Sequence, residues 1–259
     1  MKLLLPAISA CCILYLTGCS VTTTTSTDAQ NSNVEAIFHD SVTEFDIKVF
    51  YEPTAVPYTG LLNITNDTWD ITKQSYQALF QNHSARTIVT PTTLSDMTAI
   101  VAQNKTTWTL DELIALGRAN AATFSVGTKI NISVFFVKGT YNGDNAILGV
   151  QATGYPYAFI FKDVVSAAGG TSNEQKYVEQ AVVVHEVGHA VGLVNNGLPM
   201  VTNHEDSGHP KHNSNSQCVM YWQTESNSTI LSALSNFIIA GTLNLFATDS
   251  VADANAYHP

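Results

Sequence analysis

Charged residues are scarce in this chain of 259 residues, at 12%, and basic ones are scarcer than acidic ones, with 11 Lys and Arg against 21 Asp and Glu. No block of basic residues occurs, which argues against nucleic acid as a partner. The acidic balance also argues against electrostatic attraction to an anionic membrane surface. Hydrophobic residues reach 45%, so one generous domain or two small ones can bury a sizeable core.

The N-terminal apolar stretch Leu3–Leu16 is too short to cross a bilayer as a helix, which takes ~20 residues. Lys2 precedes this stretch, and "LTGC" ends it at Cys19. The order resembles a bacterial lipoprotein signal peptide and lipobox, in which the cysteine after the cleavage site is lipidated. The resemblance implies a membrane anchor at Cys19 and, from Ser20, sorting to the outer membrane. The alternatives are an ordinary secretory signal or a cytosolic protein with an apolar start.

Cysteine is also scarce, with four in the chain. Cys11 and Cys12 would leave with the signal peptide, and Cys19 would carry the lipid. Only Cys218 then remains in the mature domain, so an intramolecular disulfide is excluded despite an oxidising compartment. We expect Cys218 to be a buried, inert thiol.

Composition divides the chain into segments. Residues 20–35 are rich in Thr, Ser and Asn and lack hydrophobic periodicity, which is typical of a flexible tether. The predicted segments are a signal peptide (1–18), the lipidated cysteine and tether (19–43), and one domain (44–259) with an upper part (44–194) and a lower part (195–259).

Hydrophobic periodicity predicts the elements of the domain. The expected strands are 44–52, 85–91, 129–139, 145–154 and 157–165. The expected helices are 67–83, with Asp67 as cap; 109–124, with a capping box of Thr109 and Glu112; 171–193, with a capping box of Ser172 and Gln175; and 228–246, broken at Gly241. This order predicts an α/β (α+β) domain with a mixed, twisted sheet, a small C-terminal subdomain and a cleft between the two parts.

The stretch "HEVGHAVGLVN", residues 185–195, points to metal chemistry. His185 and His189 are four residues apart on one helix face, where both imidazoles can bind one zinc ion. Glu186 is offset from that line and can act as general base on a water that zinc activates toward a pKa of ~7. The surrounding helix is apolar on most sides and therefore buried, so these polar groups need partners. The alternative is a core helix with two histidines spaced by chance.

The third ligand lies elsewhere, because Asn195 is a poor zinc ligand. Residues 195–217 form a loop long enough to suggest function. Five of the eight histidines lie between 185 and 212. The candidates in this loop are His204, His209 and His212, with Glu205 as a carboxylate option. A second ion held by His204, Glu205, Asp206 and His209 is a further option, and a solvated polar loop is its alternative.

Two motifs carry a family resemblance. "HEVGHAVG" followed by "CVMY", residues 218–221, resembles the metzincin zinc peptidases, with Gly192 as the turn out of the helix and Met220 as the Met-turn. "HNSNSQCVM", residues 212–220, is similar to the archaemetzincin tail, in which the third zinc histidine precedes Cys, four residues, Cys, one residue and Met. Asn213 replaces the first of these cysteines, so we do not expect the family's structural zinc site to survive unchanged.

The resemblance covers roughly residues 181–221 and ranks His212 first as third ligand, ahead of His209, His204 and Asn195. It implies a metzincin-like zincin fold, one catalytic zinc ion and endopeptidase activity on a peptide or protein substrate, with Glu186 as base.

Two further roles follow from the same resemblance. Tyr221 is a candidate stabiliser of the oxyanion, with a core aromatic as the alternative. A substrate peptide would pair with a sheet edge in "AILGVQ" or "YAFIF". The alternative function is a non-catalytic, zinc-binding surface lipoprotein that binds a partner through the cleft or the 195–217 loop.

Overall fold

Residues 34–83 and 85–259 are described by the structure, a computed structural model of the chain. The expected signal peptide at 1–18, the lipidation site Cys19 and most of the expected tether lie outside the described residues. Among the helices of the described ranges, none is long and apolar enough to cross a membrane.

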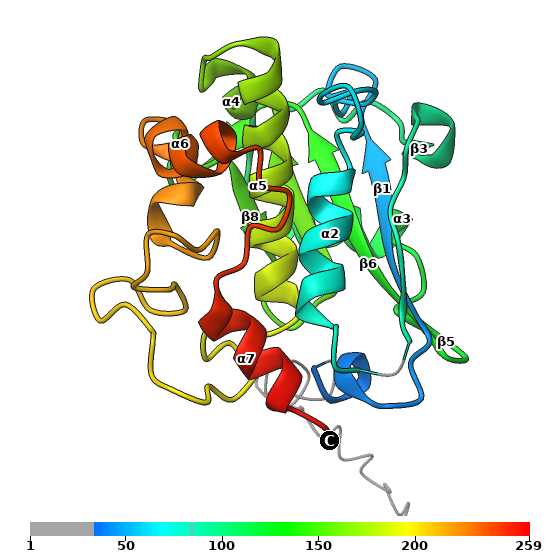
Figure 1. The fold of residues 1–259 in the computed structure, drawn as a ribbon. Coiled ribbons are helices and arrows are strands. Elements are labelled where there is room, and N and C mark those ends of the chain that lie inside the picture. Colours follow the sequence, from blue (N-terminus) through cyan, green and yellow to red (C-terminus); the bar gives the residue numbers. More distant parts are fainter. Residues whose placement is uncertain (1–33, 84) are drawn as a thin grey trace, which may run out of the picture.

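A mixed, mostly parallel sheet forms the centre of the fold, as expected (Figure 1). Its main strands, in spatial order, are β2 (Thr87–Val89), β1 (Glu44–Tyr51), β6 (Lys129–Val137), β9 (Tyr157–Phe161) and β8 (Gly149–Gln151). Neighbours are parallel except β8, which runs antiparallel to β9 at one edge. The short strands are β3 (Thr98–Ala99) beside β1, β5 (Ser125–Val126) beside β6, and the separate pair β4 (Thr107–Trp108) and β7 (Thr140–Tyr141).

The central strand β6 is buried along almost its whole length, because the sheet is covered on both faces. Phe135 of β6 lies in register with Phe50 of β1 and Phe159 of β9. The ring of Phe135 stacks on these two neighbours at centroid distances of 4.9 and 5.2 Å. This aromatic ladder ties the three parallel strands together across one face of the sheet.

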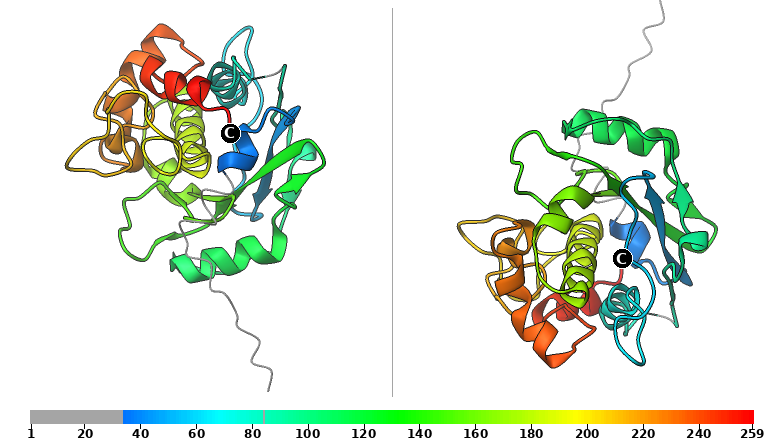
Figure 2. Two further views of the ribbon diagram at one scale, coloured as in Figure 1. Left: turned by 90° about the horizontal axis from the view of Figure 1, so that it is seen from below. Right: turned by 90° about the horizontal axis from the view of Figure 1, so that it is seen from above.

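Helices pack on both faces of the sheet, and two further helices pack on those helices. They are α2 (Asp70–Leu79), α3 (Leu110–Asn120), α4 (Lys162–Ala167), α5 (Ser172–Ala190), α6 (Ile230–Ala240) and α7 (Thr248–Ala256), with 3-10 turns η1 (Leu94–Asp96) and η2 (Trp222–Glu225). In Figure 1, α2 and α5 lie side by side on one face, where the Tyr76 hydroxyl donates to the Val184 carbonyl at 3.0 Å. Figure 2 shows α3 on the opposite face. The polypeptide after α5 returns along the flank of α5, with α6 against α5 and α7 against α2.

Several predicted elements need correction. Residues 162–165, expected to continue a strand, begin α4, because the sheet partner of β9 ends at Val137. The cap of α2 is Trp69 rather than Asp67, whose backbone amide instead donates to Asp70. The predicted capping box of α3, by contrast, is confirmed.

The C-terminal region also differs from expectation. The predicted helix 228–246 ends at Ala240, and Gly241 caps it with a φ of 63°, in the left-handed region that favours glycine. A further helix, α7, follows at Thr248–Ala256 and was not predicted. Its sequence, TDSVADANA, has only a weak apolar period, so packing rather than pattern determines it.

The boundary predicted between tether and domain at residue 43 is wrong. Residues 34–38 are helical, and Val34, Ile37 and Phe38 are fully buried in the core. Arg86 binds the same segment, donating to the carbonyls of Ile37 and His39. The folded body therefore includes residues 34–43, because three large apolar side chains at helical spacing are a stronger signal than the polar residues before them.

Candidate metal centre

The site is built on the C-terminal half of α5, which passes through the core with every residue from Tyr177 to Ala190 buried. A capping box of Thr171 and Glu174 begins the helix, one residue before the predicted pair. Gly192, with a φ of 91°, ends it, and the amide of Leu193 donates back to the Gly188 carbonyl at 3.1 Å. A Cβ at Gly192 would lie 2.6 Å from Val34 and 3.0 Å from the Leu198 nitrogen, so glycine is required at this turn.

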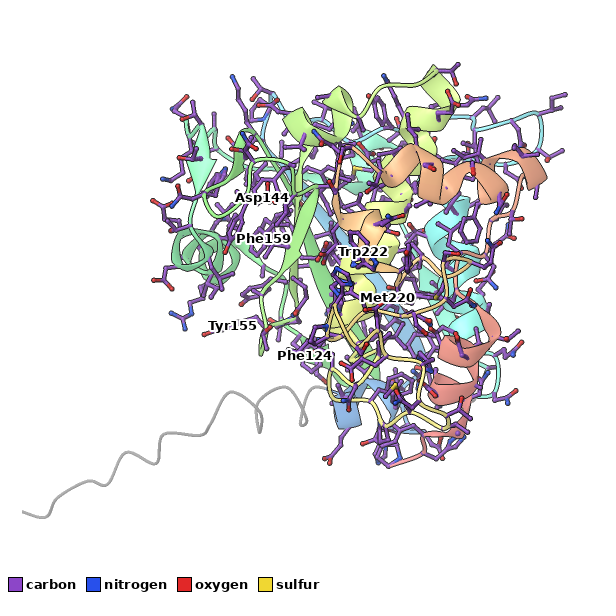
Figure 3. All side chains as sticks on the ribbon, turned by 90° about the vertical axis from the view of Figure 1, so that its left-hand side faces the viewer. Phe124, Asp144, Tyr155, Phe159, Met220 and Trp222 are labelled. Carbon is purple, nitrogen blue, oxygen red and sulfur yellow. The ribbon has the colours of Figure 1, made fainter. Side chains whose placement is uncertain are left out.

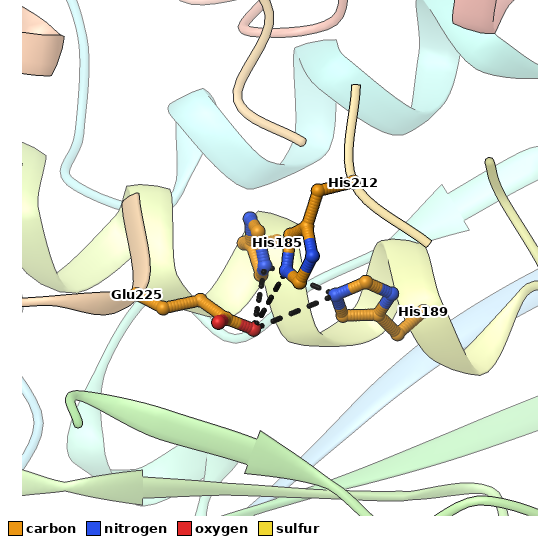
Figure 4. A group of neighbouring side chains, drawn as sticks. All are labelled: His185, His189, His212 and Glu225. Carbon is orange, nitrogen blue, oxygen red and sulfur yellow. Dashed lines mark hydrogen bonds and ion pairs between the residues drawn. The ribbon is translucent and has the colours of Figure 1, made fainter. Parts of the chain in front are cut away.

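Three imidazoles and one carboxylate converge beside this helix (Figure 4). His185 and His189 come from α5, as expected from their spacing, with their Nε2 atoms 3.0 Å apart. His212 comes from the loop and Glu225 from the end of η2. The four ligand atoms lie within 4.8 Å of one another.

Backbone carbonyls fix the tautomers of two histidines. His185 Nδ1 lies 2.8 Å from the Val219 carbonyl, and His212 Nδ1 lies 3.1 Å from the Pro210 carbonyl. Because a carbonyl oxygen can only accept, each Nδ1 carries hydrogen and each Nε2 of the neutral ring presents a lone pair to the centre. Such hydrogen bonds typically orient histidines that bind metal ions.

These lone pairs meet a carboxylate rather than a donor. His212 Nε2 lies 2.9 Å from Glu225 Oε1, and both atoms are acceptors when the ring is neutral. A proton or a metal cation must lie between them. Burial lowers the pKa of His212, but the nearby Glu225 carboxylate has the larger effect, so the pKa is raised. The carboxylate attracts a proton at this position just as it would attract a metal cation. Burial lowers the pKa of His189 to about 4, so that ring is neutral near pH 7 and available to a metal.

The residues fit a zinc ion. Bonds of ~2.0–2.1 Å in a tetrahedron separate neighbouring ligand atoms by ~3.4 Å. The recorded separations are 3.0 Å between the two α5 imidazoles, and 2.9, 3.3 and 3.8 Å from Glu225 Oε1 to His212, His185 and His189. Three nitrogens and one oxygen are also the donor types that zinc takes in proteins.

His212 is positioned by Asn213, the residue that stands where archaemetzincins have a cysteine. Asn213 is fully buried, and its backbone amide donates to the Met220 carbonyl at 2.8 Å. Its side-chain amide donates to Asp249 of α7 at 3.0 Å, and its side-chain oxygen accepts from the amide of Asn215 at 2.8 Å. An amide network thus holds the segment next to the third histidine.

Cys218 belongs to the same support. It is free and buried, as predicted, and its sulfur lies 3.4 Å from the Ser250 hydroxyl and 3.4 Å from the Ala247 amide. Burial raises the pKa of this thiol, which keeps it protonated. The thiol therefore fills space between the site and α7.

Met220 packs against α5 at Gly188. The side chain is fully buried, and its sulfur occupies the space that a Cβ at Gly188 would need, between the two histidines of α5. The neighbouring Val219 carbonyl is the one that holds His185. Figure 3 shows Met220 and Trp222 beside α5, with Phe159 among the strands.

Glu186 lies on the other side of the centre, against the edge strand β8. The backbone amide of Gln151 donates to its carboxylate, and a Cβ at Gly149 would lie 2.7 Å from its Cγ. Its Oε1 is buried without a hydrogen-bond partner. Burial raises the pKa of Glu186, and the negative charge of Glu225 raises it further.

A cavity of about 180 Å³ opens over these groups. Glu186, His189, His212 and Glu225 line it, together with residues 149–151 of β8. It therefore lies between the sheet edge and the lower part of the domain, where we expected a cleft. Of the two predicted sheet edges, "AILGVQ" contains the edge strand β8, whereas "YAFIF" is β9 and lies inside the sheet.

The other candidate ligands lie apart from the centre. His209 stacks on Trp222 at 4.1 Å and contacts Asp206 at 3.1 Å, on an exposed turn. His204 is buried beside Asp253 of α7, with 3.3 Å between Nε2 and Oδ2. Asn195 donates to Glu205 at 3.1 Å. Neither histidine belongs to a group of metal-ligand geometry in the described part of the chain.

Two further predictions have different outcomes. His204, Glu205, Asp206 and His209 are not gathered at one point, because Glu205 Oε1 accepts from the Lys211 amide and His204 turns toward α7. Tyr221 caps η2 and packs on Trp222. It is not one of the described residues that line the cavity. Tyr221 is half-buried and does not belong to the hydrophobic core, so its role as oxyanion stabiliser stays a prediction.

Glu225 was missed in the sequence. It lies five residues beyond Met220 and has no periodic relation to any other candidate ligand. Folding brings it to the centre because the Leu148 amide donates to the Glu225 carbonyl at 3.0 Å, which joins η2 to the segment before β8.

No protein-family model, no curated protein and no solved structure matches this chain. The geometry of the site therefore carries the functional argument.

Proposed function

We propose that this protein is a zinc-dependent endopeptidase of metzincin type. The observation that carries the proposal is the convergence of three imidazole Nε2 atoms beside a cavity that His189, His212 and the buried Glu186 line. Met220 under Gly188 and the glycine turn at Gly192 support the metzincin-like fold. His185, His189 and His212 would hold the ion.

Zinc at such a centre supplies Lewis acidity, which polarises a peptide carbonyl and makes water a nucleophile near neutral pH. Glu186 would take a proton from the attacking water and deliver it to the leaving nitrogen as the peptide C–N bond breaks. The Gln151 amide keeps the carboxylate aimed into the cavity.

The edge strand β8 would hold the substrate. Hydrogen bonds from Phe161 to Leu148 and from Ala152 to Tyr157 place the polar backbone groups of alternate residues toward β9. By the alternation of an antiparallel ladder, those of Gly149 point outward, and Gly149 lines the cavity. An extended peptide pairing there would pass in front of the metal centre.

The test combines zinc content with cleavage of a diverse peptide library by the purified chain. We expect one tightly bound zinc per chain, and a fall in kcat of about 10²–10⁴-fold in Glu186→Gln with zinc retained. Glu205→Gln is the matched control, because its carboxylate lies in the loop outside the cavity. Full zinc occupancy without cleavage by the wild type, in a library that includes long peptides, would refute the peptidase function.

The second candidate is a non-catalytic zinc-binding protein that uses the cavity or the 195–217 loop to bind a partner. The position of Glu225 favours this second function, because its carboxylate lies where a fourth ligand would lie. Sites closed by four protein ligands are typically structural. Glu186 favours the peptidase, because a purely structural ion has no need of a buried base with an unpartnered oxygen.

We also propose that Cys19 carries a lipid anchor that attaches the protein to the bacterial envelope, at the outer membrane. The order of Lys2, the apolar stretch and "LTGC" supports it. Cys19→Ala should abolish labelling by a radioactive fatty acid and release the protein from membranes. Labelling that persists in Cys19→Ala would contradict the anchor.

A further inference from the structure

Glu225 brings one carboxylate oxygen to the point where the three imidazoles meet. Its Oε1 lies 2.9 Å from His212 Nε2, 3.3 Å from His185 Nε2 and 3.8 Å from His189 Nε2. These values straddle the ~3.4 Å between ligand atoms of a tetrahedral zinc site. Glu225 is thus placed as a ligand and not merely as a neighbour (Figure 4).

A fourth protein ligand changes what the centre can do. A tetrahedral ion bound by three histidines keeps one position for water or substrate, whereas an ion bound also by Glu225 has none. Glu186 would then face a filled coordination sphere. The conformation in the structure is therefore a closed one with respect to peptide hydrolysis.

The side chain of Glu225 can move while its backbone stays in place. The backbone of Glu225 is fixed, because its carbonyl accepts from Leu148 and the next segment returns a bond from Asn227 to Ala146 at 3.1 Å. Its side chain is 31% exposed, whereas that of His185 is 1% exposed. The carboxylate can therefore leave by rotation of one side chain, without movement of the wall that carries it.

We propose that Glu225 is a fourth ligand which holds the metal centre closed at rest, and that its carboxylate rotates out of the cavity when a substrate carbonyl enters along β8. The ligand role stands on the geometry alone, and the gating role rests on the proposed peptidase function.

The experiment measures metal and ligand binding before activity. Zinc affinity is determined by chelator competition for the wild type, Glu225→Ala and the shape-conserving Glu225→Gln. Asp206→Asn removes an equal charge from the neighbouring loop without touching the centre and is the matched control. We expect zinc affinity to fall at least about 10–100-fold in both Glu225 variants and to change little in Asp206→Asn.

Acetohydroxamate, a small zinc-directed chelator, reports the open position in the zinc-loaded proteins. If the closed form dominates, removal of Glu225 should tighten acetohydroxamate binding by about tenfold or more, because the competent fraction rises. Glu225→Ala should also raise kcat/KM for peptide cleavage relative to the wild type at saturating zinc.

The outcomes separate the two proposals. Unchanged zinc affinity and unchanged hydroxamate binding in both Glu225 variants would overturn the ligand role, even if the wild type cleaves peptides. Weaker zinc and tighter hydroxamate binding without cleavage by any variant would uphold the ligand and refute the peptidase. Weaker zinc binding with a lower kcat/KM in Glu225→Ala would overturn the gating role.

Discussion

Two groups of side chains in the described residues have the composition and spacing of a metal site, and they differ in instructive ways. The first is the centre of His185, His189, His212 and Glu225. The second is Asp40, His83 and His258, which lie near the start of β1, after α2 and after α7.

The second group shares some features of the first. His83 is buried, its Nε2 contacts the Ala254 carbonyl at 2.8 Å, and its Nδ1 has no hydrogen-bond partner. His258 Nδ1 lies 3.2 Å from Asp40, but these two side chains are 43% and 69% exposed. The guanidinium of Arg86 also acts on both His83 and Asp40, and its positive charge opposes a cation there.

The difference shows that ligand-type residues within reach do not suffice. In the first group, two rings are fixed by one buried helix and a third by a buried amide network, so little conformational entropy is lost when an ion binds. In the second group, water can solvate two of the three side chains. We therefore expect tight zinc at the first group alone.

The largest expected effect comes from removing a ring of the helical pair. At zinc concentrations of 100 times Kd, binding stabilises the folded wild type by ~2.7 kcal/mol over the zinc-free protein. His189→Ala should lose this gain, because two histidines and a carboxylate bind far more weakly. Urea unfolding with zinc and with EDTA measures the difference. A gain of full size in His189→Ala would move the tight site to the second group.

The loop histidines give the next test. His212→Ala should weaken zinc binding by more than about 100-fold, beyond the usual cost of losing an outer hydrogen bond. His209→Ala is the matched variant, because it is the same substitution three residues away on the exposed face of Trp222. Its zinc affinity, measured by the same chelator competition, should equal that of the wild type. The reverse result would assign the third ligand to His209.

A smaller effect should follow from the support of His212. Asn213→Ala removes the bonds to Asp249 and to the Asn215 amide and leaves His212 less well oriented. Zinc affinity should fall about 10–100-fold, as for other groups that orient a ligand. Asn215→Ala, which loses only an exposed bond to Gln217, serves as control. Equal affinities in the two variants would show that Asn213 does not position the site.

The part of the site that lies on one helix could be predicted from the sequence. His185, Glu186 and His189 are local, since helical periodicity alone fixes their relative directions. The prediction of His212 as third ligand depended on its spacing to Met220 and not on any hydrophobic period. The structure brings His212 to the pair, as the resemblance implied.

The remaining parts depend on tertiary contacts that no local pattern encodes. Glu225 reaches the centre through a backbone hydrogen bond to Leu148, a residue 77 positions earlier in the chain. The polar helix α7 is held where Asp249 and Ser250 meet the residues around the site. The sequence left two candidates for the edge strand, "AILGVQ" and "YAFIF". Which of them lies outermost depends on the order in which the strands are connected and not on their composition.

The smallest expected effect is at the second group. His258→Ala should leave the zinc-dependent gain in stability unchanged and should alter unfolding without zinc by less than about 1 kcal/mol. Its ring is partly exposed and its contact with Asp40 is solvated, so water replaces most of what the substitution removes. Urea unfolding of His258→Ala with zinc and with EDTA provides the comparison. A zinc-dependent gain that falls in His258→Ala and persists in His189→Ala would reverse the ranking of the two groups, because the exposed ligands would then bind more tightly than the buried ones.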